Sequence, residues 1–360
     1  MLSHFKKLDW LLIFVVFLLS VLGLIEILSA SRGNFLNFKK QVFFVIFGFF
    51  LMFLVSFFDW RTLRETKTLI FFFYFLSLFL LLGLFLFAPK VRGTKTWYKI
   101  LLFSFDPSEI AKISLLLILA NYFSFKHPQI YKLFNIFISG IYFLAPALLV
   151  FLQPNFGGFL IFFFLWIFIL IFSGIKTKHF FLLLFIFVLF FAFSFEKILK
   201  PYQKERILSF LFPQLSDPLK SGWSQKQALI AIGSGGVFGK GFFQGSQVQL
   251  GFLPEPQGDF IFSAFAEETG FLGVLLLLLL YFVLFWRILK IGFNSNSNFA
   301  KLFAVGFFAT LICQTFLHLG SNLKLLPVIG VTLPFFGYGG SNLISNFLLL
   351  GILMSIKVNE

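Results

Sequence analysis

Long apolar runs constrain this chain more than any other feature of its sequence. A helix needs about 20 apolar residues to cross a bilayer, and runs of that length recur from one end of the chain to the other. Hydrophobic residues make up 59% of its 360 residues and charged residues only 12%, against roughly 25% charged in ordinary soluble domains. The sequence therefore predicts an all-α polytopic membrane protein with about ten transmembrane helices. We expect these spans near residues 9–29, 40–58, 68–88, 109–125, 133–152, 156–174, 179–196, 259–286, 299–319 and 341–356.

An even number of spans places both chain ends on one side of the membrane, and the basic residues beside the spans indicate which side. Lys and Arg are enriched in short cytoplasmic loops. With the N-terminus inside, the short inner segments hold more Lys and Arg than the short outer loops. The apolar run after Lys6 and Lys7 is longer than a signal-peptide core, so we interpret it as a retained span. We therefore predict cytoplasmic N- and C-termini and a large outer loop, 197–258, between spans 7 and 8.

The net charge of +15 does not indicate a nucleic-acid partner, because the basic residues lie in short segments that flank membrane spans. Two predicted outer regions are still unusually basic: residues 89–108 and the large loop 197–258. They fit an anionic extracytoplasmic ligand, or solvated loops at a lipid surface, and the composition leaves both open. The candidate ligand-binding cations are Arg92, Lys95, Arg206 and Lys240.

Charged side chains within spans are costly and mark function by default. Glu109 and Lys112 open the fourth span three residues apart, so they share a helix face and can pair. Their role is either a structural ion pair or a substrate contact. Asp259, Glu267 and Glu268 are expected in the first part of the eighth span. Asp259 follows a segment rich in proline and glycine, so it is a candidate both for the helix N-cap and for catalysis.

The segment 232–241, Ile-Gly-Ser-Gly-Gly-Val-Phe-Gly-Lys-Gly, precedes this span. Its glycines allow the backbone either to bind an anion or to pack closely against a helix. The spacing does not match a Walker loop, because Gly241 follows Lys240 where serine or threonine is required. A nucleotide hydrolase is therefore unsupported.

Four motifs in consistent order carry a resemblance to a known family. The sequence is similar to the SEDS family of bacterial shape, division and sporulation proteins, and within it more to RodA than to FtsW. The motifs are Gly233–Gly241 with Phe252–Glu255 and Asp259–Phe262, then Asp106–Lys112 (Asp-Pro-Ser-Glu-Ile-Ala-Lys), Gln153–Gly157 (Gln-Pro-Asn-Phe-Gly) and Leu326–Ser341.

Several positions depart from the family pattern. Asn155 stands where the family has aspartate, which removes one charge, and Asp106 replaces a glutamine. Gln257-Gly258 replaces His-Thr before the key aspartate, and Gly337 and Asn342 replace serines. We expect Asn155 to fill a hydrogen-bonding role.

The resemblance implies a peptidoglycan glycosyltransferase of the bacterial cytoplasmic membrane that polymerises lipid II with inversion at the anomeric carbon. Asp259 matches the family's essential aspartate. A divalent cation, Mg²⁺ or Mn²⁺, is a possible cofactor, although no ligand set is legible, and the implied partner is a class B penicillin-binding protein. A lipid-linked precursor flippase, another multispan glycosyltransferase and a non-catalytic scaffold for a transpeptidase remain as alternatives. The candidate substrate-binding residues are Arg92, Lys95, Glu109, Lys112, Gln153, Asn155, Arg206, Lys240 and Glu255.

Overall fold

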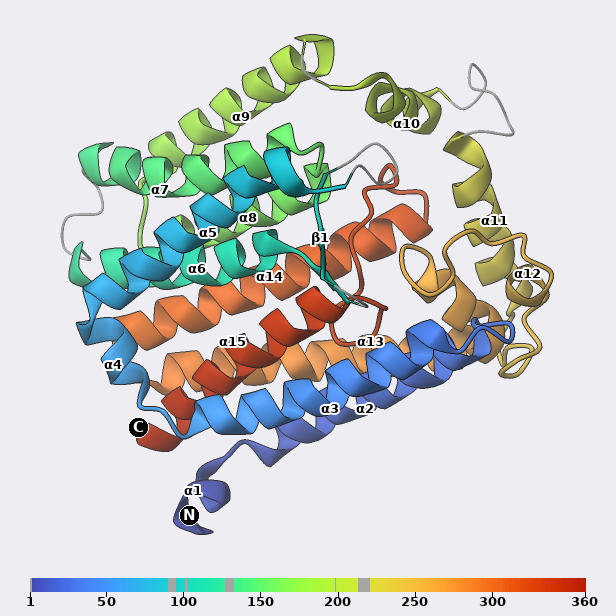
Figure 1. Cartoon of the computed structure of the whole chain (residues 1–360), viewed down its shortest axis with the longest axis horizontal. Helices are drawn as coiled ribbons and strands as arrows, with labels where there is room; N and C mark the ends of the chain where they lie inside the picture. Colours follow the sequence, from blue (N-terminus) through green and yellow to red (C-terminus); the bar gives the residue numbers. More distant parts are fainter. Residues whose placement is uncertain (1, 90–94, 101–102, 127–132, 198, 213–220) are drawn as a thin grey trace.

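The computed structural model describes residues 2–89, 95–100, 103–126, 133–197, 199–212 and 221–360. Within these residues the chain forms a bundle of long apolar helices (Figure 1). Each of the ten predicted spans coincides with one of them, which confirms the all-α membrane fold. The helices are α2 (Trp10–Ser29), α3 (Leu36–Ser56), α5 (Lys67–Phe87), α6 (Pro107–Lys126), α7 (Leu133–Leu152), α8 (Phe156–Phe172), α9 (Thr177–Lys197), α13 (Ile261–Asn294), α14 (Asn298–Asn322) and α15 (Gly340–Asn359). Among the described residues nine of these helices are long and apolar enough to cross a membrane, and α8, with 17 residues, is shorter.

Helix α14 forms the centre of the bundle, where it packs against α13, α8 and α6. At Gly306 the neighbouring helices come so close that an added methyl group would lie 3.1 Å from Leu116 of α6 and from Leu165 and Ile169 of α8. Small residues are the usual means of such close packing in a membrane, because van der Waals contact is the main attraction between helices there. A second tight pair, α15 and α3, lies beside this centre.

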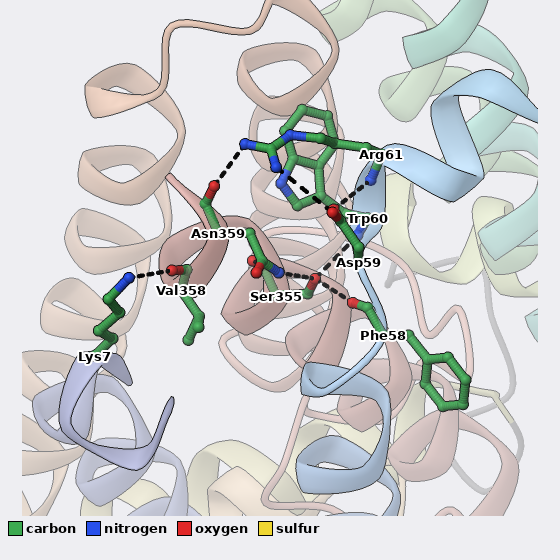
Figure 2. A network of polar contacts seen from close by, with 8 residues as sticks. All are labelled: Lys7, Phe58, Asp59, Trp60, Arg61, Ser355, Val358 and Asn359. Carbon is green, nitrogen blue, oxygen red and sulfur yellow. Dashed lines mark hydrogen bonds and ion pairs between the residues drawn. The ribbon is translucent and has the colours of Figure 1, made fainter. Parts of the chain in front are cut away.

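Both chain ends lie at the same end of the bundle (Figure 1), as an even number of spans requires. Figure 2 shows how the last turn of α15 is held there. Lys7, from the short helix α1 (Leu2–Lys7), donates to the Val358 carbonyl at 3.3 Å, and Arg61, from α4 (Trp60–Glu65), donates to the Asn359 carbonyl at 2.7 Å. The Ser355 hydroxyl donates to the Phe58 carbonyl and accepts from the Trp60 N–H.

The two basic regions contain regular structure. Strands β1 (Tyr98–Ile100) and β2 (Phe103–Phe105) pair antiparallel, with Tyr98 opposite Phe105. The region from 197 to 258 carries three helices, so the expected long loop is a helical segment: α10 (Pro201–Leu211), α11 (Ser221–Ser234) and α12 (Ser246–Gln249). Local sequence explains the start of α10, because Pro201 occupies the first turn and the Gln203 side chain accepts from the Lys200 N–H at 3.0 Å.

Candidate functional site

Asp259 lies in the turn that leads into α13, at the opposite end of that helix from the chain termini. The helix begins at Ile261, and its N-cap is Phe260, which makes no side-chain capping bond. The expectation that Asp259 lies within the span is therefore wrong by two residues, and the alternative in which it serves as the N-cap is not realised. The turn keeps Asp259 partly exposed. By contrast, Glu267 and Glu268, about two turns into the helix, are 0% and 1% exposed.

A buried asparagine at the end of α14 holds this turn. The Asn322 amide donates to the carbonyls of Asp259 at 2.9 Å and His318 at 2.8 Å. Its carbonyl oxygen accepts from the Ser263 hydroxyl at 2.6 Å and the Ser263 N–H at 3.2 Å. Because Asn322 is completely buried and fully bonded, it fixes the backbone of Asp259 relative to two spans.

The Asp259 carboxylate faces the segment that connects α14 to α15. Gly330 in that segment has a φ of +75°, and a methyl group added to it would lie 3.8 Å from an Asp259 carboxylate oxygen. The predicted Arg206 reaches the same segment from α10, since its guanidinium donates to the Val328 carbonyl at 3.3 Å. The structure thus brings two sequence-predicted site residues, Asp259 and Arg206, to neighbouring positions on one segment.

Glu255 shapes the same turn through its backbone. Its φ is +44°, and its carbonyl accepts from the N–H groups of Gly258 at 3.1 Å and Phe260 at 3.3 Å. The Tyr338 N–H then donates to the Gln257 carbonyl at 2.9 Å. The turn and the α14–α15 segment are therefore joined at more than one point. The Glu255 side chain is exposed on this surface.

Glu109 and Lys112 form the ion pair that their spacing predicts, with 2.5 Å between ammonium and carboxylate. Lys112 is only 2% exposed and Glu109 15%. Helix α15 completes the cluster, because Asn342 donates to one Glu109 oxygen at 3.0 Å and the Ser345 hydroxyl to the other. The predicted ion pair is confirmed, while its role, structural or as a substrate contact, stays a prediction.

The glycine-rich segment packs against a break in α13 at Gly270, where φ is +68° and ψ is −167°. The break removes two helical bonds, and the segment replaces all four backbone partners. Lys240 and Gly241 donate to the carbonyls of Glu267 at 3.0 Å and Glu268 at 2.9 Å, while Phe271 and Leu272 donate to the carbonyls of residues 236 and 237. Buried backbone groups require such partners, so the segment serves helix packing, the second alternative.

Lys240 takes part in the same junction. Its ammonium lies 2.6 Å from the buried Glu267 carboxylate, which also accepts from the Ser246 hydroxyl at 3.2 Å and the Gln247 N–H at 3.0 Å. The Lys240 side chain is 29% exposed. The structure thus assigns the Lys240 charge to Glu267, and binding of substrate by Lys240 stays a prediction.

Two further predicted residues are held by backbone carbonyls. Lys95 donates to the Phe85 carbonyl at the end of α5 at 2.8 Å. The buried Gln153 side chain donates to the Leu81 carbonyl of α5 at 2.9 Å. Gln153 therefore joins α7 to α5 instead of facing an open surface. Arg92 lies outside the described residues.

These features place the chain among known proteins. The family model described as "Cell cycle protein", which covers FtsW, RodA and SpoVE, matches residues 9–360. The chain belongs to this family. Stage V sporulation protein E of Bacillus subtilis is 34% identical, over 97% of this chain and 96% of that protein. Peptidoglycan glycosyltransferase MrdB of Escherichia coli K12 is 36% identical, over 80% and 77%.

A solved structure described as "Structural coordination of polymerization and crosslinking by a peptidoglycan synthase complex" is similar throughout. It has a TM-score of 0.83 and 30% identity, and the match covers 98% of each chain. The family resemblance is confirmed by these comparisons. The RodA-type resemblance is confirmed as well, because the solved structure of RodA from Thermus thermophilus has a TM-score of 0.73 and 29% identity, and the match covers 97% of this chain and 96% of that chain.

The departures from the family pattern have local structural explanations. Asn155 is the N-cap of α8, and its side-chain oxygen accepts from the Gly158 N–H at 2.9 Å, which confirms the expected hydrogen-bonding role. Asp106 accepts from the Ser108 N–H at 2.9 Å just before α6. Burial and the neighbouring Glu109 carboxylate raise the pKa of Asp106 to about 7. Asn342 still supplies the donor to Glu109 that a serine could supply.

The His, Cys, Asp and Glu side chains of the described residues do not define a metal site by themselves. Across the described ranges no group of three or more His, Cys, Asp and Glu side chains is placed to hold a metal ion. Asp259 would offer a divalent cation one carboxylate, and water or substrate phosphates would have to complete the coordination sphere. The cation therefore stays a prediction.

A further acid, which the sequence motifs do not single out, is buried inside a span. Glu26 in α2 is 0% exposed, and neither of its oxygens has a hydrogen-bond partner among the described residues. Three residues later on the same helix, the Ser29 hydroxyl donates to the Glu268 carboxylate at 2.5 Å. The available signal was an acid inside an apolar span, which is costly by default.

Proposed function

We propose that this family member is a peptidoglycan glycosyltransferase that polymerises lipid II into β-1,4 glycan strands during cell wall elongation. The names of its relatives favour this activity over the flippase and scaffold alternatives. The observation that carries it is the contrast among neighbouring acids. Glu267 is buried in an ion pair and Glu268 is buried beside Ser29, whereas Asp259 is partly exposed on a fixed turn.

The reaction needs a group that accepts a proton. The acceptor's GlcNAc 4-hydroxyl attacks C1 of the donor's MurNAc, and its proton passes to Asp259 as the new C1–O bond forms. The bond from C1 to undecaprenyl pyrophosphate breaks, and the pyrophosphate leaves with the electron pair. Attack opposite the leaving group converts the α-linked donor into a β-linked product.

The leaving group carries negative charge, so nearby cations stabilise the transition state. Arg206 contacts the α14–α15 segment at the Val328 carbonyl, two residues before Gly330, which faces the Asp259 carboxylate. Lys112 acts indirectly. It pairs with Glu109, and the Glu109 carboxylate orients Asn342 and Ser345 at the start of α15. We assign Arg206 to the pyrophosphate and Lys112 to positioning.

The side of the membrane on which Asp259 lies follows from the same proposal. The Arg287–Asp9 ion pair lies at the terminal end of α13, and the part of α13 after the break at Gly270, Phe271–Asn294, alone spans about 36 Å. Asp259 is therefore on the opposite side from both termini. With cytoplasmic termini, Asp259 faces the outer surface where lipid II is presented. A class B penicillin-binding protein is the proposed partner, supported by the similarity to a complex that coordinates polymerization and crosslinking.

The test is polymerisation of labelled lipid II by purified protein in the presence of that partner. Asp259→Asn should abolish glycan synthesis, a loss of at least about 100-fold, with unchanged lipid II binding and melting temperature. Glu205→Gln, which removes an exposed acid from α10, is the matched control and should retain activity. Full activity in Asp259→Asn would overturn the catalytic assignment.

A further inference from the structure

A cavity of about 200 Å³ lies between α5, α6 and α7. Lys67, the first residue of α5, and Phe125, near the end of α6, both line it. Its wall on α6 runs from Ile118 to Phe125, about 9 to 20 Å along the helix from Lys112. Because α4 leads directly into α5 and Arg61 of α4 binds the C-terminal turn (Figure 2), the cavity lies at the terminal end of the bundle. It is therefore separate from the Asp259 site.

The rim of the cavity is positively charged. The Lys67 ammonium lies 4.7 Å from the centre of the Phe125 ring, and the Arg64 guanidinium carbon lies 5.7 Å from the same centre. Within the part of the chain that the structure describes, neither cation has an ion-pair partner. Glu65 lies between them in sequence and is exposed. Two cations over one ring leave charge available to an anion.

The wall of the cavity consists of apolar side chains and of polar side chains that already have hydrogen-bond partners. Ile70 and Ile118 are 2% and 3% exposed, and the rings of Phe71 and Tyr142 lie 6.1 Å apart. The Asn121 amide on this wall donates to the Arg64 carbonyl at 2.8 Å, and the Tyr122 hydroxyl donates to Asn135 at 3.0 Å. A polar ligand would find few open partners here, whereas a hydrocarbon chain would fit.

We propose that this cavity binds one anionic diacyl phospholipid. Its phosphate group contacts Lys67 and Arg64, and part of one acyl chain enters between α5, α6 and α7. Basic pockets between spans at a membrane surface recognise anionic headgroups in this way. A zwitterionic lipid would fill the same wall but gain less from the two cations, and free phosphate would use the cations without the wall.

Native mass spectrometry of the purified full chain tests this proposal. The probes are phosphatidylglycerol, phosphatidylcholine with the same acyl chains, and glycerol phosphate. Lys67→Gln should weaken phosphatidylglycerol binding about fivefold, the loss expected for one juxtamembrane cation, and weaken phosphatidylcholine binding by less. Arg64→Gln should have a similar effect. Both side chains lie at the surface end of the helices, and an unchanged melting temperature verifies folding.

Lys290→Gln is the matched control. Lys290 is also exposed, and its ammonium lies 5.1 Å from the centre of the Trp286 ring, but it does not line this cavity. Binding by this variant should equal that of the unaltered protein. The proposal is overturned if Lys290→Gln weakens binding as much as Lys67→Gln, if phosphatidylcholine binds as well as phosphatidylglycerol, or if glycerol phosphate displaces the lipid.

Discussion

Helices α9 and α14 are both long enough to cross a membrane, yet their surroundings are opposite. In α14 78% of the most apolar stretch is buried, and in α9 only 11%, although α9 is the more apolar helix. Helix α9 reaches the bundle through aromatic rings. Phe187 stacks on Phe163 of α8 with ring centres 3.9 Å apart, and Phe190 meets Phe151 of α7 at 5.5 Å. His179 and Ser194 of α9 are also buried, and most of its other side chains are exposed.

The difference shows that apolar composition does not identify the interior of a membrane bundle. Lipid is as apolar as leucine, so burial brings little solvent gain, and packing and polar contacts decide which helix lies inside. Helix α14 carries Gln314, His318 and Asn322 on its buried surface. The interior helices hold the polar side chains that fix Asp259 and Glu109, whereas α9 carries mainly phenylalanine.

The buried ion pair gives the sharpest test of this contrast. Lys112→Ala should lower the free energy of unfolding by about 3–5 kcal/mol, because it leaves Glu109 buried without its partner. Thermal unfolding in detergent measures the loss. Lys178→Ala on α9, where the lysine is exposed, should change the same quantity by less than about 1 kcal/mol.

A double variant separates the two roles of Lys112. Replacing both partners by apolar or neutral residues, as in Glu109→Gln with Lys112→Met, should recover most of the lost stability. If Lys112→Ala abolished polymerisation without lowering the melting temperature, Lys112 would be a substrate contact instead of a positioning residue.

Replacing one phenylalanine near the middle of each of the two helices should give a smaller effect. Phe307 in α14 is 0% exposed and Phe185 in α9 is 59% exposed. Phe307→Ala should lower the free energy of unfolding by roughly 2–3 kcal/mol. This is less than in the core of a soluble protein, because transfer of the side chain to lipid costs little and mainly the cavity that it leaves is destabilising. Phe185→Ala should leave thermal unfolding nearly unchanged. Equal losses would mean that α9 is packed as tightly as α14.

The spans could be predicted from sequence because a bilayer demands long apolar runs. The ion pair of Glu109 and Lys112 could be predicted because the two residues are close in sequence. Sequence could not predict the approach of Asp259 to Gly330, which brings together positions far apart in the chain. The break at Gly270 lies in a run that reads as one continuous helix, and only the glycine-rich segment makes it stable. Helix α11 was missed because its 14 residues are too polar for a membrane span and its buried residues, Ala228 and Ala231, pack through tertiary contacts.

The smallest expected effect concerns α8, the helix that lies between α9 and α14. Asn155 caps α8 through its side-chain oxygen, and aspartate caps helices about as well as asparagine. Asn155→Asp should therefore change the free energy of unfolding by less than about 0.5 kcal/mol and leave lipid II polymerisation intact. Asn155→Leu removes the cap and should cost about 1 kcal/mol, measured by the same thermal unfolding. Polymerisation that appears only after Asn155→Asp would mean that the charge at this position is required. In that case asparagine at this position would abolish activity although it caps the helix, and capping would not be the only role of the position.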